Sequence, residues 1–387
     1  MKAICTFLFI IYSFIGFSQN YVGLYVNDFK TIIANSSKEI QLLEYAQNNG
    51  FNYLILYNLS YIQDNIFQID DFTESLPLAN FIENAKTNYG IMQVAAVGEK
   101  NASFDKIKAY NSFYPSNPNK RFDVFNIEFE FWNDNLTGPS DYYCTHYLQP
   151  NGYACTEAGA FQFYSSQLDL MKTYGDQNGI ITETYIGYIT PSEGDIIAQN
   201  TNRVLIHYYR TSDFYTNGDS IFQYHPERLE NLATNNQVVV MPIFSARINH
   251  MYNWLLTPNL LTQPYDTYLN GINGFYSQTV SWIENNVALD GYVWYRYSDL
   301  LAINSVLSFN EQSIENATVF YNSTNKQLHL INFNPNDKIT IYNTVGEKLF
   351  ANKTDLIIDV SNLNNGVYIV KINLDNKKQY TKRIMVY

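Results

Sequence analysis

The segment 123–132, Asp-Val-Phe-Asn-Ile-Glu-Phe-Glu-Phe-Trp, holds the residues best suited to chemistry. Side chains alternate between the two faces of a β-strand, so Asn126, Glu128, Glu130 and Trp132 share one face and the residues between them are apolar. Two carboxylates one pleat apart repel each other, and burial disfavours their charged forms, so the pKa of one of them is expected to rise. A carboxyl group that keeps its proton can act as a general acid. A buried ion-pair network or a solvated strand end is the alternative interpretation.

Eight strand-length segments alternate with amphipathic helical stretches before residue 312. The strands are predicted at 21–29, 51–59, 91–99, 122–132, 181–189, 203–210, 237–247 and 289–299. The helices are predicted to include 37–49, 78–89, 158–174, 226–236 and 271–286. This alternation is typical of an α/β fold of the (β/α)8 TIM-barrel type, expected over 19–312. A doubly wound open sheet is the alternative, but no glycine-rich phosphate loop follows the first strand.

In such a barrel, functional groups lie at the C-terminal ends of the strands. The apolar face of the fourth strand would pack outward against helices, so its polar row would point into the barrel. We therefore expect Glu128 and Glu130 at the barrel mouth.

The fourth strand resembles that of glycoside hydrolase family 18, the chitinases and endo-β-N-acetylglucosaminidases. Asp123-x-x-Asn126-x-Glu128-x-Glu130 is similar to the family's D-x-x-D-x-D-x-E signature. Other strands resemble the family in the expected order, namely 94–98 (third), 205–209 (sixth), 238–242 (seventh) and 291–294 (eighth). The resemblance covers most of the first unit.

The resemblance implies substrate-assisted, retaining hydrolysis beside N-acetylglucosamine. Glu130 would protonate the glycosidic oxygen, and Glu128 would orient the 2-acetamido group that attacks the anomeric carbon. Tyr208 or Tyr209 would hold the acetamido oxygen, and Trp294 would form the floor under the sugar ring. The remaining substrate-binding candidates are Asn126, Asp123 and Trp132.

Two positions depart from the family pattern. Asn126 replaces an aspartate, and Glu128 replaces the assisting aspartate with a side chain that is one methylene longer. A shift of about 1 Å can cost on the order of a hundredfold in rate. A non-catalytic barrel that binds glycans, as an adhesin or scavenging component, is therefore the second hypothesis.

Other chemistries find less support in the sequence. The seventh strand has no glutamate to act as a covalent nucleophile, although Glu99 and Glu183 could supply a second carboxylate. The five histidines show no metal-ligand spacing, and there is no G-x-S-x-G motif, so we expect neither a metal nor another cofactor. The net charge of -12 argues against nucleic acid and suits a glycan or glycoprotein substrate.

The N-terminus predicts export. Residues 1–18 read as a secretory signal peptide, with Lys2 before a short apolar run, and a membrane anchor is the alternative. Cleavage would remove Cys5 and leave Cys144 and Cys155, which are expected to form a disulfide in an exported protein. That disulfide would stiffen a long, tyrosine-rich loop (133–157) beside Glu130, either as a glycan-contacting wall or as a pinned insertion.

The character of the chain changes near residue 312. Residues 3–325 hold 31 acidic and 14 basic side chains, whereas 326–387 hold five acidic and nine basic ones. The later segments 338–343, 358–363, 366–372 (Gly-Val-Tyr-Ile-Val-Lys-Ile) and 382–386 alternate as short strands with Gly and Asn turns, which predicts a small all-β sandwich over 313–387.

This second unit resembles the C-terminal sorting domain of type IX secretion substrates, and an accessory carbohydrate-binding module is the alternative. The resemblance implies the type IX secretion machinery as a partner, passage through the periplasm and outer membrane, and a secreted or surface location. We expect a monomer.

Overall fold

The computed structural model describes ten stretches of the chain. They are residues 21–209, 225–256, 261–271, 286–309, 318–323, 325–334, 337–343, 347–353, 355–373 and 379–386. The predicted signal peptide at 1–18, nearly all of the predicted helix 271–286 and the expected domain boundary at 312 lie outside them.

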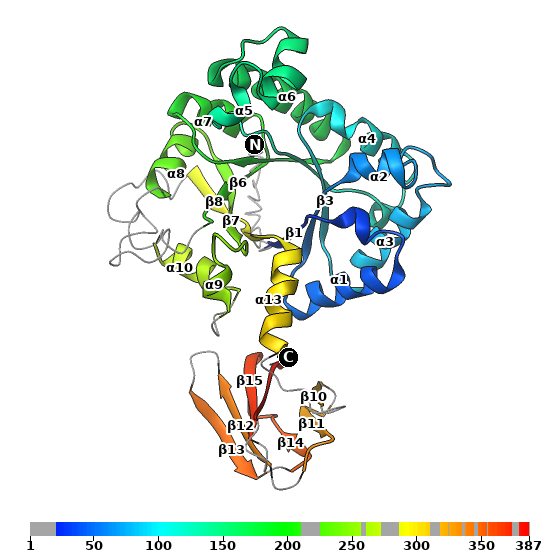
Figure 1. Ribbon diagram of the computed structural model, residues 1–387, viewed down its shortest axis with the longest axis vertical. Helices are drawn as coiled ribbons and strands as arrows, with labels where there is room; N and C mark the ends of the chain where they lie inside the picture. The colour runs from blue at the N-terminus through cyan, green and yellow to red at the C-terminus, as the bar shows by residue number, and fades with distance from the viewer. Residues whose placement is uncertain are drawn as a thin grey trace, which may run out of the picture.

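A closed barrel of eight parallel strands forms the first unit (Figure 1). Its strands are β1 (Tyr21–Val26), β2 (Tyr53–Leu56), β3 (Gln93–Gly98), β4 (Val124–Ile127), β5 (Ile181–Ile186), β6 (Arg203–His207), β7 (Val238–Ser245) and β9 (Gly291–Tyr295). Each strand pairs with the next, and β9 closes the ring between β7 and β1. The predicted (β/α)8 fold is confirmed.

The last barrel strand contains an irregularity that a glycine makes possible. The short strand β8 (Val287–Leu289) pairs with the first half of β7, and β9 pairs with its second half after Asp290. Gly291 has φ +107°, and a Cβ there would lie 1.8 Å from the Tyr21 carbonyl oxygen. Only glycine combines this backbone conformation with so close an approach.

Helices surround the barrel, as Figure 1 shows. They are α1 (Ser36–Asn48), α2 (Leu59–Asn65), α3 (Leu76–Asn88), α4 (Asp105–Ser112), α6 (Glu157–Asn178), α7 (Pro191–Gln199), α8 (His225–Ala233), α10 (Gln263–Gly271) and α13 (Tyr297–Phe309), with short turns α5 (Asp134–Thr137) and α9 (Tyr252–Leu255). Local signals start several of them: Thr190 and Glu193 form a capping box on α7, and Asn35 caps α1. No described helix is long and apolar enough to cross a bilayer.

The predicted strands 122–132 and 289–299 are too long. Strand β4 ends at Ile127 because its neighbour β3 ends at Gly98, whose carbonyl accepts the Glu128 N–H at 2.9 Å. Beyond β9, the chain enters helix α13 at Tyr297. A parallel strand lasts only as long as its partner supplies hydrogen bonds.

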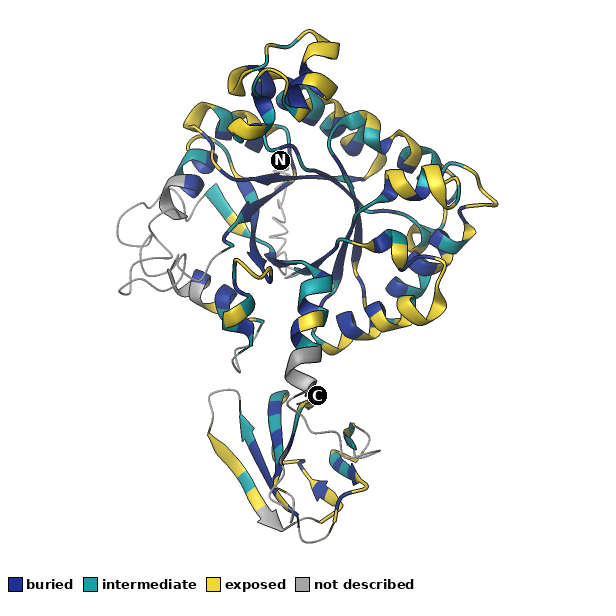
Figure 2. Cartoon of the chain, viewed as in Figure 1, coloured by how far each residue is buried: buried dark blue, intermediate teal, exposed yellow. Residues whose placement is uncertain are grey.

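Two apolar layers hold the barrel together, and Figure 2 shows its strands largely buried. Outward-facing side chains such as Phe125, Ile127 and Trp294 pack with the helices in one large cluster. Inward-facing side chains form a second cluster inside the barrel, which includes Tyr25, Tyr53, Ile55, Ala95, Val124, Tyr185, Leu205, Met241, Ile243 and Val293.

The lower barrel interior holds a buried polar network. Glu183 is fully buried and pairs with Arg203 at 2.5 Å. The Tyr53 hydroxyl donates to Glu183 at 2.7 Å and the Asn126 amide donates at 2.6 Å. Arg203 also donates to the Gln93 side-chain oxygen at 3.1 Å. These bonds compensate the desolvation of both charges.

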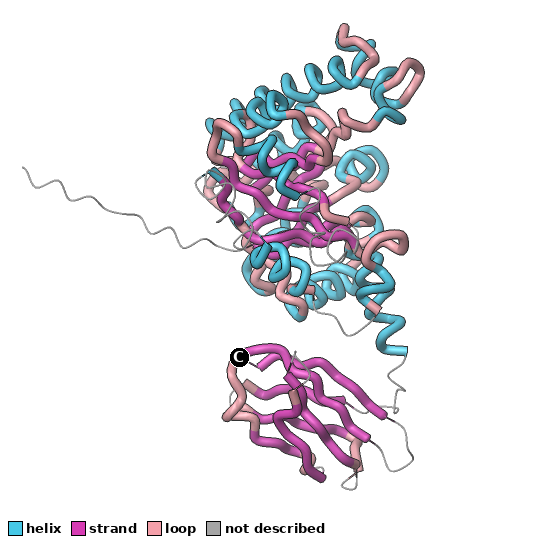
Figure 3. The backbone as a smooth tube through the Cα atoms, turned by 90° about the vertical axis from the view of Figure 1, so that its left-hand side faces the viewer, coloured by secondary structure: helices cyan, strands magenta, loops and turns pink. Residues whose placement is uncertain are grey.

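The second unit consists of two antiparallel sheets, seen as strands in Figure 3. One contains β10 (Thr318–Asn322), β11 (Gln327–Ile331) and β14 (Ile357–Asp359), and the other contains β12 (Lys338–Asn343), β13 (Lys348–Lys353), β15 (Gly366–Asn373) and β16 (Gln379–Val386). Alternate residues such as Ile339, Ile341, Val370 and Ile372 form its buried core. The predicted all-β unit is confirmed.

Replacing Arg203 by methionine should lower the free energy of unfolding by about 3–5 kcal/mol, because it leaves the Glu183 carboxylate buried without its cation. Urea unfolding followed by circular dichroism measures this. Arg121→Met is the control: it removes a partly exposed guanidinium whose hydrogen bond to the Asn178 carbonyl is 3.5 Å long, and it should cost about 0.5 kcal/mol or less. Equal losses in the two variants would contradict the role given to the buried pair.

Candidate functional site

The polar row that follows from β4 points into the barrel. Asn126 is buried and bonded to Glu183, whereas the intervening Phe125, Ile127, Phe129 and Phe131 lie in the helix-facing cluster. Glu128 and Glu130 continue the inward row beyond the last strand residue and are partly exposed. They therefore stand at the C-terminal mouth of the barrel, where a ligand can reach them.

Glu128 is the carboxyl group whose protonation is most altered. Its pKa is raised to about 8, first by burial and then by the charges of Glu130 and Glu183, against the opposing effect of the nearby Tyr25 hydroxyl. Glu183 itself is paired with Arg203 in the lower network. At neutral pH the site therefore retains a proton beside Glu130.

Glu130 is held by the loop that follows it. Its carboxylate accepts a hydrogen bond from the Asn133 amide at 3.0 Å, and its backbone N–H donates to the Tyr143 hydroxyl at 3.1 Å. Tyr143 itself stacks on Phe129, with ring centroids 4.0 Å apart. The carboxylate is thus oriented by one side chain and the backbone by another.

Aromatic side chains line the same mouth. Tyr25 lies 5.6 Å from Tyr57 and 5.4 Å from Tyr295 between ring centroids, and Tyr209 lies 5.0 Å from the His250 ring and 6.2 Å from Tyr295. Such rings offer flat apolar faces with polar edges, which suits the binding of sugars.

Trp132 and Tyr185 also belong to this aromatic lining of the mouth, and their ring centroids are 5.5 Å apart. The Tyr185 hydroxyl is 2.8 Å from Nδ1 of His207. Gly187 permits this arrangement, since a Cβ there would lie 2.6 Å from Nε1 of Trp132 and 2.7 Å from Cε1 of His207.

The structure corrects three expected positions. Trp294 is fully buried in the helix-facing layer, where its indole N–H donates to the Leu261 carbonyl at 3.0 Å. Tyr208 also faces outward and packs against Tyr268. The inward residues of these strands are their neighbours Tyr295 and Tyr209, because successive side chains alternate between the two faces.

Asp123 is the third correction. Its carboxylate pairs with Lys86 at 2.7 Å and accepts the Val94 N–H at 2.8 Å, at the N-terminal end of the barrel. Burial raises its pKa, against the opposing charge of Lys86. Asp123 stabilises the start of β4 through these contacts and does not reach the mouth.

The other two carboxylates considered from the sequence are both engaged. Glu183 belongs to the lower network with Arg203. Glu99 accepts hydrogen bonds from the hydroxyls of Tyr142, at 3.3 Å, and Tyr147. The sequence reasoning missed the mouth-lining residues Tyr25, Tyr57, Tyr185, His207, His250 and Tyr295. For those on strands, the alternation of inward and outward side chains along the strand could have identified them.

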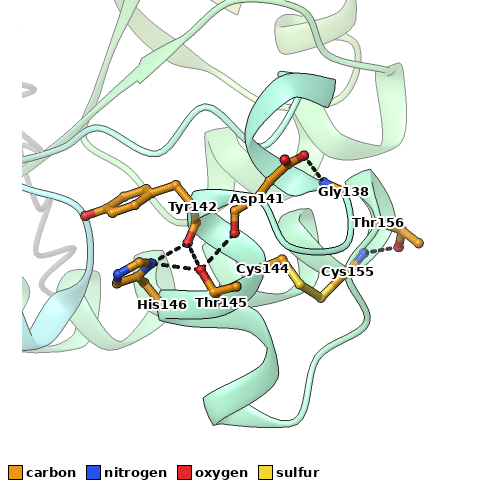
Figure 4. The surroundings of a disulfide bond; sticks show 9 residues. Gly138, Asp141, Tyr142, Cys144, Thr145, His146, Cys155 and Thr156 are labelled. Carbon is orange, nitrogen blue, oxygen red and sulfur yellow. Dashed lines mark hydrogen bonds between the residues drawn. A yellow bond between two sulfur atoms is a disulfide. The ribbon is translucent and has the colours of Figure 1, made fainter.

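The Cys144–Cys155 disulfide is present and closes part of the loop after β4 (Figure 4). Within the loop, the Asp141 carboxylate accepts the Gly138 N–H at 3.0 Å, and its backbone carbonyl accepts the Thr145 hydroxyl at 2.9 Å. Tyr142, Tyr143 and Tyr147 extend from this stapled segment to Glu99 and Glu130. The loop therefore forms one side of the mouth.

No group of three or more His, Cys, Asp or Glu side chains among the described residues is arranged to hold a metal ion. The inner-facing acids instead have tyrosine, asparagine and arginine partners.

Comparison with known families identifies the second unit. Residues 318–387 match the model of the secretion system C-terminal sorting domain. This tail marks the protein for export by type IX secretion to the cell surface or the extracellular space, and it implies an interaction with that machinery. No curated protein sequence matches the chain.

Solved structures similar to the chain include glycoside hydrolases and other TIM-barrel enzymes. Bacteroides uniformis beta-glucuronidase 2 is 8% identical, with a TM-score of 0.44 over 95% of this chain and 46% of its own. A family 18 chitinase from Pseudoalteromonas aurantia is 14% identical, with a TM-score of 0.37 over 74% and 98% of the two chains. The YdjI aldolase from Escherichia coli K12 is 10% identical, with a TM-score of 0.36 over 76% and 82%.

The chain thus spans less than half the length of the glucuronidase that it resembles. The chain is an exported protein with a TIM-type barrel and a type IX secretion sorting domain.

The raised pKa of Glu128 predicts a pH-dependent stability. The folded chain keeps the Glu128 proton up to about pH 8, whereas an unfolded glutamate releases it near 4.5. The stabilisation that comes from this proton is therefore complete below about pH 4.5 and is lost as the pH rises to 8. Relative to Glu128→Gln, the wild type should therefore lose thermal stability between these pH values. Glu44→Gln, at an exposed position on α1, is the charge-matched control. Parallel melting-temperature curves for wild type and Glu128→Gln would contradict the prediction.

Removing the disulfide with Cys144→Ser and Cys155→Ser should lower the free energy of unfolding by about 3 kcal/mol, since the crosslink restricts a loop of separation 11 in the unfolded chain. Denaturant unfolding under oxidising conditions measures this. Wild type treated with a reductant should match the double variant, and a cost near zero would show that the loop is held by its tyrosine contacts alone.

Proposed function

We propose that the barrel is a glycosidase that cleaves glycans beside N-acetylglucosamine at the Glu128–Glu130 pair. The observation that carries this proposal is the placement of two carboxyl groups, one of them holding its proton near neutral pH, in an aromatic-lined barrel mouth. The export tail supports it, because extracellular glycans are then within reach. The family 18 resemblance of the fourth strand supplies the mechanism.

The two carboxyl groups would have different roles in the reaction. In the free protein the retained proton lies on Glu128. A 2-acetamido N–H directed at Glu128 favours its ionised form, because a carboxylate accepts that hydrogen bond, and the proton then passes to Glu130. Glu130 is the group nearer the rim of the mouth, where Asn133 orients it.

The reaction would follow in two steps. Glu130 gives its proton to the glycosidic oxygen as the bond to the anomeric carbon breaks, and the acetamido oxygen attacks that carbon from the other face to give a cyclic oxazolinium. Water then attacks the anomeric carbon and returns a proton to Glu130, which leaves the configuration retained. Tyr209, which faces the mouth, takes the acetamido-holding role in place of Tyr208.

A non-catalytic glycan-binding barrel is the second candidate. The observation that favours it is the engagement of the Asn126 amide with Glu183, at the position where the family signature has a further acid. The longer Glu128 side chain adds to this departure. Both candidates require the same aromatic mouth, so an activity measurement separates them.

The test is product analysis by mass spectrometry after incubation of the full chain with chito-oligosaccharides and with an N-glycosylated glycoprotein. Glu130→Gln should lower kcat by about 10²- to 10⁴-fold, because it removes the proton donor. A substrate with a good leaving group, such as a 4-nitrophenyl glycoside, should recover much of that loss because it needs no proton. Glu44→Gln is the matched control and should keep wild-type kcat.

Wild-type activity should also fall as the pH rises through about 8, when the pair loses its retained proton. Cleavage that survives Glu130→Gln with a natural substrate would rule out this site. Glycan binding without any cleavage by the wild type would establish the binding barrel instead.

A further inference from the structure

The barrel mouth is divided by charge. Glu128 and Glu130 lie at the end of β4, with Glu99 next to them at the end of β3. Arg228 and Arg247 lie on the segments that follow β6 and β7, the second and third strands along the ring from β4. Neither arginine makes an ion pair with a carboxylate among the described residues, although the first unit as a whole is rich in acids.

Arg228 is the less expected of the two because it is buried, with 6% of its surface exposed. Its Nη1 donates to the His207 backbone carbonyl at 2.5 Å, and its buried Nε has no acceptor among the described residues. A guanidinium has five N–H donors, and a buried cation without an anionic partner is costly. The position is therefore arranged to accept an anion from outside the chain.

An exposed aromatic ring stands beside this guanidinium. Tyr188, just beyond β5, has 57% of its surface exposed, and its ring centroid is 4.7 Å from Cζ of Arg228. A tyrosine ring offers a flat apolar face on which a sugar ring can stack. Tyr208 is the second ring beside Arg228, with its centroid 5.6 Å from Cζ.

Tyr185 connects this position to the acid pair. Its hydroxyl is bonded to Nδ1 of His207, whose carbonyl holds Arg228. Burial raises the pKa of Tyr185, and the charge of Glu130 raises it further while the charge of Arg228 lowers it. Tyr185 also contacts Trp132, two residues from Glu130, with ring centroids 5.5 Å apart, so one side chain connects the Arg228 and Glu130 positions and sugars bound at the two would be neighbours in one glycan.

We propose that Arg228 and Tyr188 form a subsite for an acidic sugar, whose carboxylate pairs with the guanidinium while its ring stacks on the tyrosine. The substrate class is then a glycan that carries a carboxylate-bearing sugar next to N-acetylglucosamine. Only the identity of that neighbouring sugar rests on the proposed function. The acidic subsite itself depends on binding and not on cleavage.

The test uses the full-length Glu130→Gln protein, so that bound glycans are not hydrolysed. Calorimetric titration compares hyaluronan oligosaccharides, which alternate glucuronate with N-acetylglucosamine, against neutral chito-oligosaccharides of equal length. The acidic ligand should bind about tenfold more tightly or better, and the difference should shrink as salt is raised. Equal affinities, or binding of the neutral ligand alone, would overturn the subsite.

Variants in the same background locate the effect. Arg228→Gln should remove the preference for the acidic ligand and leave the affinity for the neutral one unchanged, whereas Arg121→Gln, with the same change in charge at the opposite end of the barrel, should leave both unchanged. Arg228→Lys keeps the charge but loses the planar fork, and should retain only part of the preference. Tyr188→Ala changes an exposed side chain, and should weaken the acidic ligand without affecting the melting temperature.

An unchanged preference in both Arg228→Gln and Tyr188→Ala would overturn the assignment to these residues. Cleavage of chito-oligosaccharides by the wild type is measured separately. Its absence, together with tight binding of the acidic ligand, would refute the proposed glycosidase and leave the subsite standing.

Discussion

The cost of placing carboxyl groups inside a narrow barrel governs the arrangement of its polar side chains. An eight-stranded barrel leaves room only for its own inward side chains, and water is excluded from the lower part. Each inward acid must therefore find a cation, keep its proton or lie near the opening. Glu183, the deepest of the three, pairs with Arg203; Glu128 above it holds a proton; Glu130 at the rim is partly exposed and bonded to Asn133.

Because the three acids lie at different depths, they differ in their partners and in their protonation. Arg203 directs its donors to Glu183, Gln93 and Asp290 in the lower interior. The ion-pair network that was the alternative interpretation of the acidic row is thus real, but it occupies the lower interior. Its presence there contributes to the raised pKa at the mouth, since the charge of Glu183 is among the causes.

The tyrosines and the stapled loop fix the shape of the opening. A tyrosine can fill the barrel with an apolar ring and still direct a hydroxyl to a carboxyl or an imidazole, as Tyr53 and Tyr185 do. Outside the cell, the Cys144–Cys155 bridge is stable, and the tyrosines beside it reach Glu99 and the Glu130 backbone. The acid side of the mouth is therefore held by covalent and hydrogen-bonded contacts together.

Local sequence features were enough to predict the barrel, the small β-unit with its sorting function, the disulfide and the inward row through Glu128 and Glu130. These follow from local periodicity, from the even cysteine pair and from a specific motif, none of which needs distant contacts. Which neighbour on each later strand faces inward depends on the folded barrel, where Tyr295 and Tyr209 take the inward positions expected for Trp294 and Tyr208. A register shift of one residue reverses every side chain on a strand, and in a barrel the pairing of strands far apart in sequence fixes that register. The partners of Glu183, Arg203 and Arg228 were likewise decided by the closed ring, because they come from strands and helices that only its closure brings together.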